Sequence, residues 1–365
     1  MSTILSNDGL ASMSWQQVVY NQIVQRKTTE LDATSTKLQE AFDSKSDYYD
    51  AQSNQLAKVK ASISNADLAV DNGKDGIADI KEALLQMRIL VGQYGEAESD
   101  EERGLIRDKF DEYVDKINRT ADTYSAAYNP IGNVTRTDWT PNSIDFTKNL
   151  AGETVEMQGT YVGADFYIEA DDGTIWVPDP GSSSITQYET FNTLNPADST
   201  KGEGFVSTRN GLKLVDYQAD TGDISLIVDP NNAATPVSGK LVTGGIGLMQ
   251  SWFYGGLDTE EGRQAASAAL DEADNLVAAA EARVGGMSTT VKAASTSVDR
   301  ELEALNADRS EAMTEQLSAT YALQVKQQQE LLLLKQTFQN MASQQSYYKS
   351  IFAGAGTSPL FDFTS

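Results

Sequence analysis

The chain has 365 residues, with 28 Lys plus Arg against 53 Asp plus Glu, and it contains neither His nor Cys. Without these two residue types there can be no disulfide, no thiolate nucleophile, no zinc site of the usual ligands and no serine–histidine pair. The formal net charge of −25 argues against nucleic acid and anionic membranes as partners. We therefore expect a protein that is not an enzyme and carries no cofactor or metal.

No segment of the sequence suggests a membrane span or a cleaved leader. The longest apolar run of note, residues 331–334, is far too short to cross a bilayer. The first residues, Met1–Asp8, lack the basic and apolar regions of a secretory signal peptide. The sequence predicts no membrane insertion, and secretion would have to use another route.

Proline placement divides the chain into three parts. The eight prolines leave residues 1–129 and 237–358 free of proline, so long helices are expected only in these two arms. The middle, about 131–255, holds 15 of the 27 glycines and contains short apolar runs. Asp172-Gly173, between two such runs, is a hairpin signal. We predict a mostly α fold in which both arms form a long helical bundle or coiled coil, with a central antiparallel β domain inserted between them.

The N-terminal arm carries one long apolar seam. Its residues alternate steps of three and four, which predicts a long helix, and only Gly73 in the series lacks a side chain. Ser99 and Glu102 then offer a capping box for a second helix, antiparallel to the first because the connection is short. The predicted assembly seam consists of Leu56, Val59, Ile63, Val70, Ile77, Ile80, Leu84, Met87 and Val91.

The C-terminal arm repeats this pattern from Ala266 to Leu305 and can supply a third bundle helix. Gly285-Gly286 lies in the middle of its seam. Because glycine costs about 1 kcal/mol relative to Ala in a helix, the pair indicates either a bend or a close approach of another helix, and the sequence leaves both open.

The two ends of the chain carry weaker apolar stripes, rich in Gln and Ser. Helices of this kind are marginal alone, so they are expected either to order on assembly or to pair with each other within a monomer. The residues predicted to pack the end helices are Leu10, Val24, Leu31, Leu38, Leu317, Tyr321, Leu332, Phe338, Met341 and Tyr348.

Stretches in both arms match the sequence pattern of one family of bacterial proteins. The run 63–77 is similar to the flagellin segment in which Ala-Asn-Asp-Gly-Ile precedes a helix ending in Arg-x-Leu-x-x-Gln, an ending found here as Arg88 to Gln93. Residues 106–120 resemble the next flagellin helix, and 291–318, followed by a Gln-rich helix, resembles the flagellin C-terminus. The resemblance covers about 1–125 and 260–352 and none of the insert.

This resemblance implies a structural subunit that is exported by the flagellar type III apparatus with a chaperone and self-assembles into the extracellular filament for motility, with hook-associated and cap proteins as partners. Arg88 and Gln93 match flagellin positions used in packing neighbouring subunits and by the innate receptor of animal hosts. The implied domains are an N-terminal end helix (1–45, in the filament core and disordered in the monomer), N-terminal bundle helices (46–130), a variable β-rich surface domain (131–255), a C-terminal bundle helix (256–310), a C-terminal end helix (311–352) and a tail (353–365).

Two departures from the flagellin pattern keep alternatives open. Residues 38–49 retain Asp47 but lack the glycine turn of the flagellin segment, and the tail runs past the usual flagellin end. Both fit a divergent flagellin or the related hook-filament junction protein. A secreted coiled-coil adhesin or another non-flagellar structural protein remains a further alternative.

Acidic residues in the insert also allow a metal-binding or catalytic site as an alternative interpretation. Asp165, Glu169, Asp171, Asp172 and Asp179 allow a calcium site or a pair of glycosidase carboxylates. The sequence favours a simpler interpretation, because Asp171-Asp172-Gly173 is the composition of a hairpin turn. The insert also contains three tryptophans, Trp139, Trp176 and Trp252. We expect them in the core or at its boundary rather than on a surface that binds sugars.

Overall fold

The computed structural model describes residues 15–122, 129–134, 139–179, 183–192, 198–229 and 235–354. The chain divides into two compact units. The central unit is Gln55–Arg300, and the terminal unit comprises Met1–Asn54 with Glu301–Ser365, of which 15–54 and 301–354 are described. Among the described residues, no helix offers a stretch long and apolar enough to span a bilayer.

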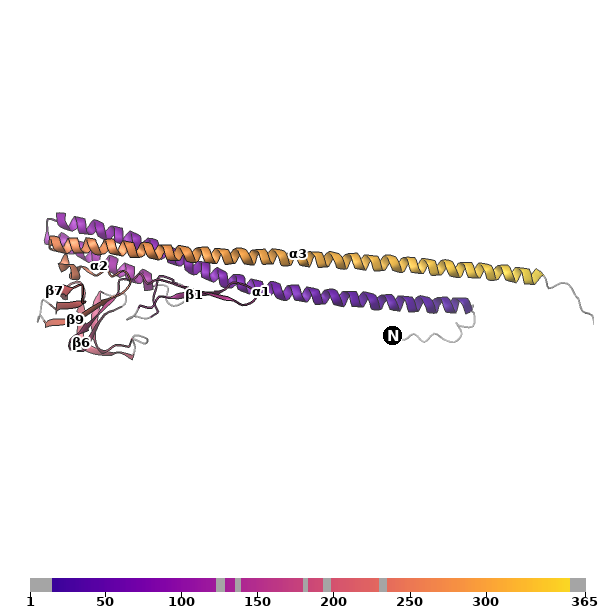
Figure 1. Ribbon diagram of the computed structural model, residues 1–365, viewed down its shortest axis with the longest axis horizontal. Helices are drawn as coiled ribbons and strands as arrows, with labels where there is room; N and C mark the ends of the chain where they lie inside the picture. Colours follow the sequence, from indigo (N-terminus) through magenta and orange to yellow (C-terminus); the bar gives the residue numbers. More distant parts are fainter. Residues whose placement is uncertain are drawn as a thin grey trace, which may run out of the picture. The chain divides into compact units, whose positions relative to one another are not determined.

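The fold is mostly α with an antiparallel β insert, as the sequence predicts (Figure 1). Helix α1 is Trp15–Glu96, α2 is Asp100–Asp122 and α3 is Glu260–Gly354. All nine residues of the predicted seam on α1 are buried, from Leu56 to Val91. Val277, Val284 and Val291 on α3 are buried as well. Spacing at three and four residues therefore marks the faces that form the core of the central unit.

The turn between α1 and α2 is capped by side chains. The Glu102 N–H donates to Ser99 Oγ at 3.2 Å, which is the first half of the predicted capping box. The Glu102 carboxylate accepts instead from the Glu98 N–H, also at 3.2 Å. Three acidic residues, Asp100 to Glu102, occupy the first turn of α2, where they complement the positive end of the helix dipole.

Two buried glycines of α1, Gly73 in the seam and Gly76 beside it, make room for the loop that follows α2. A Cβ at Gly73 would lie 2.5 Å from Pro130 Cγ, and one at Gly76 would lie 2.6 Å from Ile131 Cδ1. The side chains of Pro130 and Ile131 thus occupy the space beside these two glycines, including the seam position that lacks a side chain. Gly285 and Gly286 differ, because α3 continues through both and a Cβ at either would meet nothing within 4 Å. Within the described residues, nothing approaches this glycine pair closely.

The insert forms two antiparallel sheets. The first is a hairpin of β1 (Ser143–Thr147) and β2 (Thr154–Gln158). The second has the order β6-β5-β4-β3-β9-β8-β7. Its strands are β3 Phe166–Ala170, β4 Ile175–Pro178, β5 Ser184–Thr190, β6 Thr200–Ser207, β7 Leu212–Gln218, β8 Asp223–Val228 and β9 Thr235–Thr243. The predicted hairpin turn is confirmed: Gly173 has φ of 86° and joins β3 to β4, a backbone conformation that glycine adopts without a Cβ clash.

Polar contacts hold the insert on the helices of the central unit. The Thr147 N–H donates to Ser62 Oγ of α1 at 3.1 Å, and Arg283 of α3 donates to the Gly159 carbonyl at 3.2 Å. On α2, Asp111 accepts two hydrogen bonds from Ser251. Ser251 begins η2, a 3-10 helix at Ser251–Leu257 that leads into α3. The insert is thus connected to all three helices.

The predicted domain boundaries can be placed on these elements. α1 passes through 45/46 and α3 passes through 310/311 without an interruption. α2 ends at Asp122, before the predicted boundary at 130, and α3 begins at Glu260, after the predicted boundary at 255. The tail 355–365 and residues 1–14 lie outside the described residues.

Candidate assembly surfaces

The terminal unit is a pair of helical segments held by few contacts. Tyr20 and Phe338 meet edge to face with ring centroids 5.0 Å apart. Gln316 donates to Gln39 Oε1 at 3.0 Å. Among the described residues, three ion pairs also join the two segments: Lys27–Glu330 and Lys45–Glu315 at 3.6 Å and Arg309–Asp50 at 3.1 Å. Exposed ion pairs contribute about 0–1 kcal/mol each, so these contacts stabilise the pairing of the two helical segments only weakly.

Burial in the terminal unit is low. Of its described residues, Ala312 is the sole hydrophobic residue that is buried. Leu31, Leu331 and Leu334 are half-buried and line an apolar groove of about 310 Å³ between the two segments. Two helices in contact cover only one stripe of each other, so further partners are needed to remove these side chains from water.

The C-terminal segment of α3 carries a second apolar stripe that no described residue covers. Met313, Leu317, Tyr321 and Leu332 are 56%, 61%, 71% and 65% exposed. Their spacing of four, four and eleven residues places them on one side of the helix. Leu323, Leu334 and Phe338 lie on a different side and are half-buried. The segment therefore has two apolar sides, of which one packs against α1.

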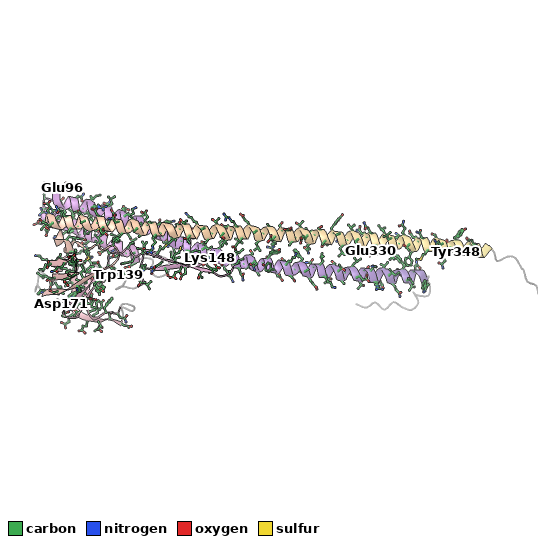
Figure 2. All side chains as sticks on the ribbon, in the orientation of Figure 1. Glu96, Trp139, Lys148, Asp171, Glu330 and Tyr348 are labelled. Carbon is green, nitrogen blue, oxygen red and sulfur yellow. The ribbon has the colours of Figure 1, made fainter. Side chains whose placement is uncertain are left out.

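The predicted end-helix residues divide between these two environments. Half-buried members are Val24, Leu31, Leu38 and Phe338. Exposed members are Leu317, Tyr321, Leu332, Met341 and Tyr348, the last near the end of α3 (Figure 2). Leu10 lies outside the described residues. The predicted set thus combines residues of both sides of α3, because its irregular apolar spacing does not separate neighbouring faces of the helix.

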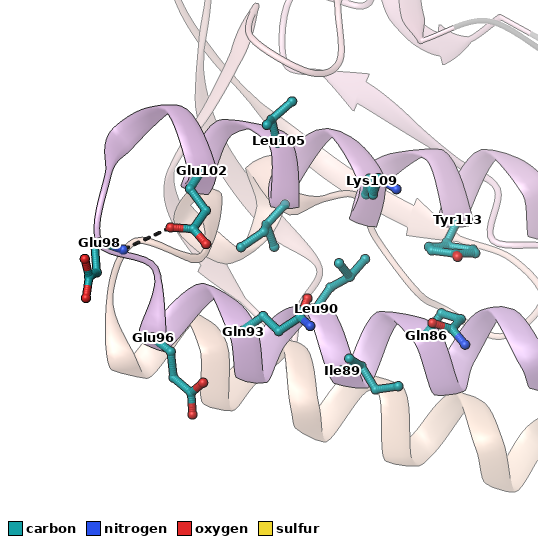
Figure 3. A pocket seen from close by; sticks show the side chains of 11 residues that line it. Gln86, Ile89, Leu90, Gln93, Glu96, Glu98, Glu102, Leu105, Lys109 and Tyr113 are labelled. Carbon is teal, nitrogen blue, oxygen red and sulfur yellow. Dashed lines mark hydrogen bonds between the residues drawn. The ribbon is translucent and has the colours of Figure 1, made fainter.

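A second candidate surface is a groove between α1 and α2 in the central unit (Figure 3). It has a volume of about 740 Å³, with Ile89 and Leu90 from α1 and Leu105 and Ile106 from α2 among its lining residues. Leu105 is 61% exposed and Ile89 is 45% exposed. Its remaining residues are Gln86, Gln93, Glu96, Glu98, Glu102, Lys109 and Tyr113. Exposed apolar side chains among polar ones are a composition found at protein-binding surfaces.

Arg88 and Gln93 are not brought together. Gln93 lines the α1–α2 groove. Arg88 instead forms ion pairs with two carboxylates of α3, Asp271 at 2.7 Å and Asp274, and also donates to the Leu270 carbonyl at 3.2 Å. The side chain is 35% exposed. The resemblance implies a contact of Arg88 with a neighbouring subunit, whereas the structure gives its guanidinium partners within the same chain.

Three acidic residues of the insert accept hydrogen bonds from nearby residues, and one of them is Asp165, which accepts from the Tyr161 hydroxyl at 2.5 Å. Asp172 accepts from the N–H and hydroxyl of Thr174, which lowers the pKa of its carboxyl group. Asp179 accepts from the hydroxyls of Ser184 and Thr186, both at 2.8 Å. Within the part of the chain that the structure describes, no three acidic residues are grouped to hold a metal ion. Three tryptophans, Trp139, Trp176 and Trp252, are buried.

Sequence reasoning missed two acidic residues on α2. Asp111 is 1% exposed and Asp115 is largely buried, and both accept hydrogen bonds from the insert. The available signal was their position next to Phe110 and Val114, two apolar residues that are buried on α2. A carboxylate at such a position needs hydrogen-bond partners from another element.

Comparison with known proteins gives distant structural matches. No family model matches the chain, and no curated protein matches it. Flagellar hook-associated protein 3 from Legionella pneumophila is 11% identical with a TM-score of 0.35, covering 73% of this chain and 99% of that one. The flagellar junction protein FlgL from Legionella pneumophila is 12% identical with a TM-score of 0.32, covering 75% and 99%. FlgL from Xanthomonas campestris is 10% identical with a TM-score of 0.25, covering 78% and 99%.

Proposed function

We propose that this protein is a structural subunit of the bacterial flagellum that assembles through its terminal helices, and that it acts as the junction protein between hook and filament. The observation that carries the assembly role is the terminal unit. Its described residues present apolar stripes at helical spacing, yet Ala312 is the one hydrophobic residue among them that is buried. Packing against other subunits would bury these stripes at about 25 cal/mol per Å² of apolar surface.

The flagellar assignment rests on the flagellin-like residues of the two arms. A heterologous contact of terminal helices with terminal helices of a neighbour, repeated without closing into a ring, produces an open helical assembly. The partners would be further copies of the chain together with hook-associated and cap proteins. Delivery to the extracellular flagellum would use the flagellar type III export apparatus and a chaperone. No catalytic step is part of this function.

The choice of junction protein over filament subunit depends on residues 38–49. Flagellins carry a glycine turn in this region, and here α1 is continuous through it. A filament subunit is the second candidate, favoured by the flagellin-like runs 63–77 and 88–93.

Copy number distinguishes these two candidates. We expect immunogold labelling of intact flagella to mark only the hook-proximal end, and the protein to be a trace component of sheared filaments. Labelling along the whole filament would instead identify the filament subunit.

Truncation tests the assembly mechanism itself. A chain lacking residues 1–40 should remain folded in its central unit and fail to incorporate into flagella. Incorporation of the truncated chain at the wild-type level would refute the role of the terminal helices.

A further inference from the structure

A single carboxylate on α2 binds the beginning of η2. The Ser251 N–H donates to Asp111 Oδ1 at 2.6 Å, and the Ser251 hydroxyl donates to Asp111 Oδ2 at 2.9 Å. Both oxygens of one buried side chain are therefore used by one residue. Ser251 is followed in η2 by three buried residues, Trp252, Tyr254 and Leu257, so this contact fixes the segment that connects the β domain to α3.

A second carboxylate, one helical turn further along α2, extends the contact. Asp115 accepts from Ser183 Oγ and from Gln250 Nε2, both at 3.1 Å, and its carboxylate lies 3.9 Å from the Arg209 guanidinium. Asp111 and Asp115 thus join α2 to the β4–β5 connection and to the segment that follows β9. Asp115 and Arg209 are the charged groups that act on Asp111. Tyr254, whose pKa is raised by burial, is the nearby titratable group on η2.

The surroundings of Asp111 disfavour its charged form. Burial raises the pKa of the Asp111 carboxyl group to about 7, and the negative charge of Asp115 raises it further, while the two bonds from Ser251 and the charge of Arg209 oppose the shift. Burial also raises the pKa of Asp115. Since the two acids interact, their titration belongs to the pair.

The hydrogen bonds at this site do not require a charge. A protonated Asp111 can donate its own proton to Ser251 Oγ while its other oxygen still accepts the Ser251 N–H. The neutral form therefore keeps both contacts and avoids the desolvation cost of a buried carboxylate. We propose that Asp111 is a pH-sensitive latch: its buried carboxyl group, bound by both donors of Ser251, holds η2 and the attached β domain on α2 most firmly when protonated, and this contact loosens when the group ionises.

The direction of the effect follows from proton linkage. The closed contact binds the Asp111 proton more tightly than an opened one, in which the carboxyl group meets water and has its ordinary pKa near 4. The extra stability of the closed state is complete below that value, decreases as the pH rises and is lost above about 7. Opening of η2 should therefore become more frequent between mildly acidic and neutral pH.

Hydrogen exchange of the full-length monomer tests this latch. Protection of the Ser251 amide and of the η2 amides is measured from pH 5.5 to 8.5, above the sequence pI of about 4.3, and corrected for the intrinsic exchange rate. We expect wild-type protection to fall with increasing pH, by up to ~10-fold per unit below pH 7, and then to level off. Asp111→Asn, which can accept the Ser251 N–H and donate to its hydroxyl, should remove this dependence. Equal pH profiles for the wild type and Asp111→Asn would overturn the proposal.

A second variant keeps the test decisive if Asp111→Asn does not fold. Ser251→Ala removes the hydroxyl that stabilises the ionised carboxylate, so the midpoint of the profile should move to higher pH. Ser183→Ala, which removes a bond to Asp115 only, is the matched control and should shift the midpoint much less. If Ser251→Ala lowers protection by the same factor at every pH, Asp111 is a structural residue without a latch function.

Discussion

The central and terminal units use the same two helices in different ways. In the central unit, which also contains α2 and the β insert, the predicted seam of α1 is buried, as are Val277, Val284 and Val291 of α3. In the terminal unit, the described segments of the same helices have only each other, and Ala312 is the one hydrophobic residue among them that is buried. The spacing of apolar residues is similar in both. Periodicity therefore predicts a helix and its apolar side, while the number of packing partners decides whether that side is buried.

This contrast predicts that substitutions in the central unit change the stability of the monomer, and that substitutions on the outward stripe of the terminal unit change assembly alone. The largest effect is expected for Ile77→Asp. Ile77 is 2% exposed in the middle of the seam, and an unpaired carboxylate there costs several kcal/mol against a typical domain stability of about 5–15 kcal/mol. We expect loss of helical circular dichroism and of cooperative urea unfolding.

The matched control for Ile77→Asp is Leu68→Asp. Leu68 belongs to the same helix but is 59% exposed, so its replacement should change the free energy of unfolding by less than about 1 kcal/mol. Similar urea midpoints for the two variants would mean that the seam is not buried in the folded protein.

Two glycine-to-alanine substitutions should change the stability of the monomer in opposite directions. Gly73→Ala places a Cβ against the rigid ring of Pro130 and should destabilise the monomer by about 1–3 kcal/mol. Gly285→Ala meets open space on an exposed side of α3 and should stabilise it by about 1 kcal/mol. Thermal unfolding of both variants in one buffer checks the prediction. A stabilising Gly73→Ala would contradict the packing of the Pro130 loop on α1.

Arg88→Ala is expected to have a smaller effect, about 1–2 kcal/mol on monomer stability. The guanidinium contacts two carboxylates and a carbonyl of α3, and charge-assisted bonds of this kind are stronger than single exposed ion pairs. Arg88→Lys should recover part of the lost stability, because lysine keeps the positive charge but lacks the planar guanidinium group that binds two carboxylates at once. Arg26→Ala, whose side chain is 83% exposed, is the control. Unchanged monomer stability together with impaired assembly would restore the neighbouring-subunit role that the flagellin resemblance implies.

The fold class, the buried seam and the Gly173 hairpin could be predicted from the sequence because each depends on local spacing or local backbone chemistry. The order of the seven strands could not, since pairing such as β3 with β9 joins residues that are far apart in the chain. The same limit applies to Gly73, whose partner Pro130 comes from a distant loop. Asp111 was missed because the Ser251 that accompanies it lies 140 residues away.

The terminal stripes show a different limit of the sequence. Leu317 and Leu323 are both apolar, and a pattern with steps of three, four and seven accepts either as an inward residue. Only the pairing register, set by contacts such as Tyr20 with Phe338, determines that Leu323 is half-buried and Leu317 is exposed. Side chains on the exposed side are therefore where assembly is best tested.

The smallest effect on the monomer, and the most specific effect on assembly, is expected for the double substitution Leu317→Ser and Tyr321→Ser. These side chains are 61% and 71% exposed, so their removal should change monomer stability by no more than about 0.5 kcal/mol per site. If a neighbouring subunit covers them, the double variant loses most of the burial that two large apolar side chains provide, about 1.5–3 kcal/mol each. Its critical concentration for assembly, measured by light scattering and sedimentation, should then rise by at least ~100-fold, since 1.4 kcal/mol corresponds to a factor of ten.

The matched control exploits the two sides of the same helix. Leu323→Ser, on the half-buried side, should weaken the pairing of the terminal segments in the monomer, seen as faster hydrogen exchange between residues 301 and 340. The outward double variant should leave that exchange unchanged, because its side chains make no part of the packing against α1. If the outward variant assembles at the wild-type critical concentration while Leu323→Ser does not, the stripe at Leu317 and Tyr321 faces solvent in the assembly as well, and the contact between subunits must lie on another side of the helix.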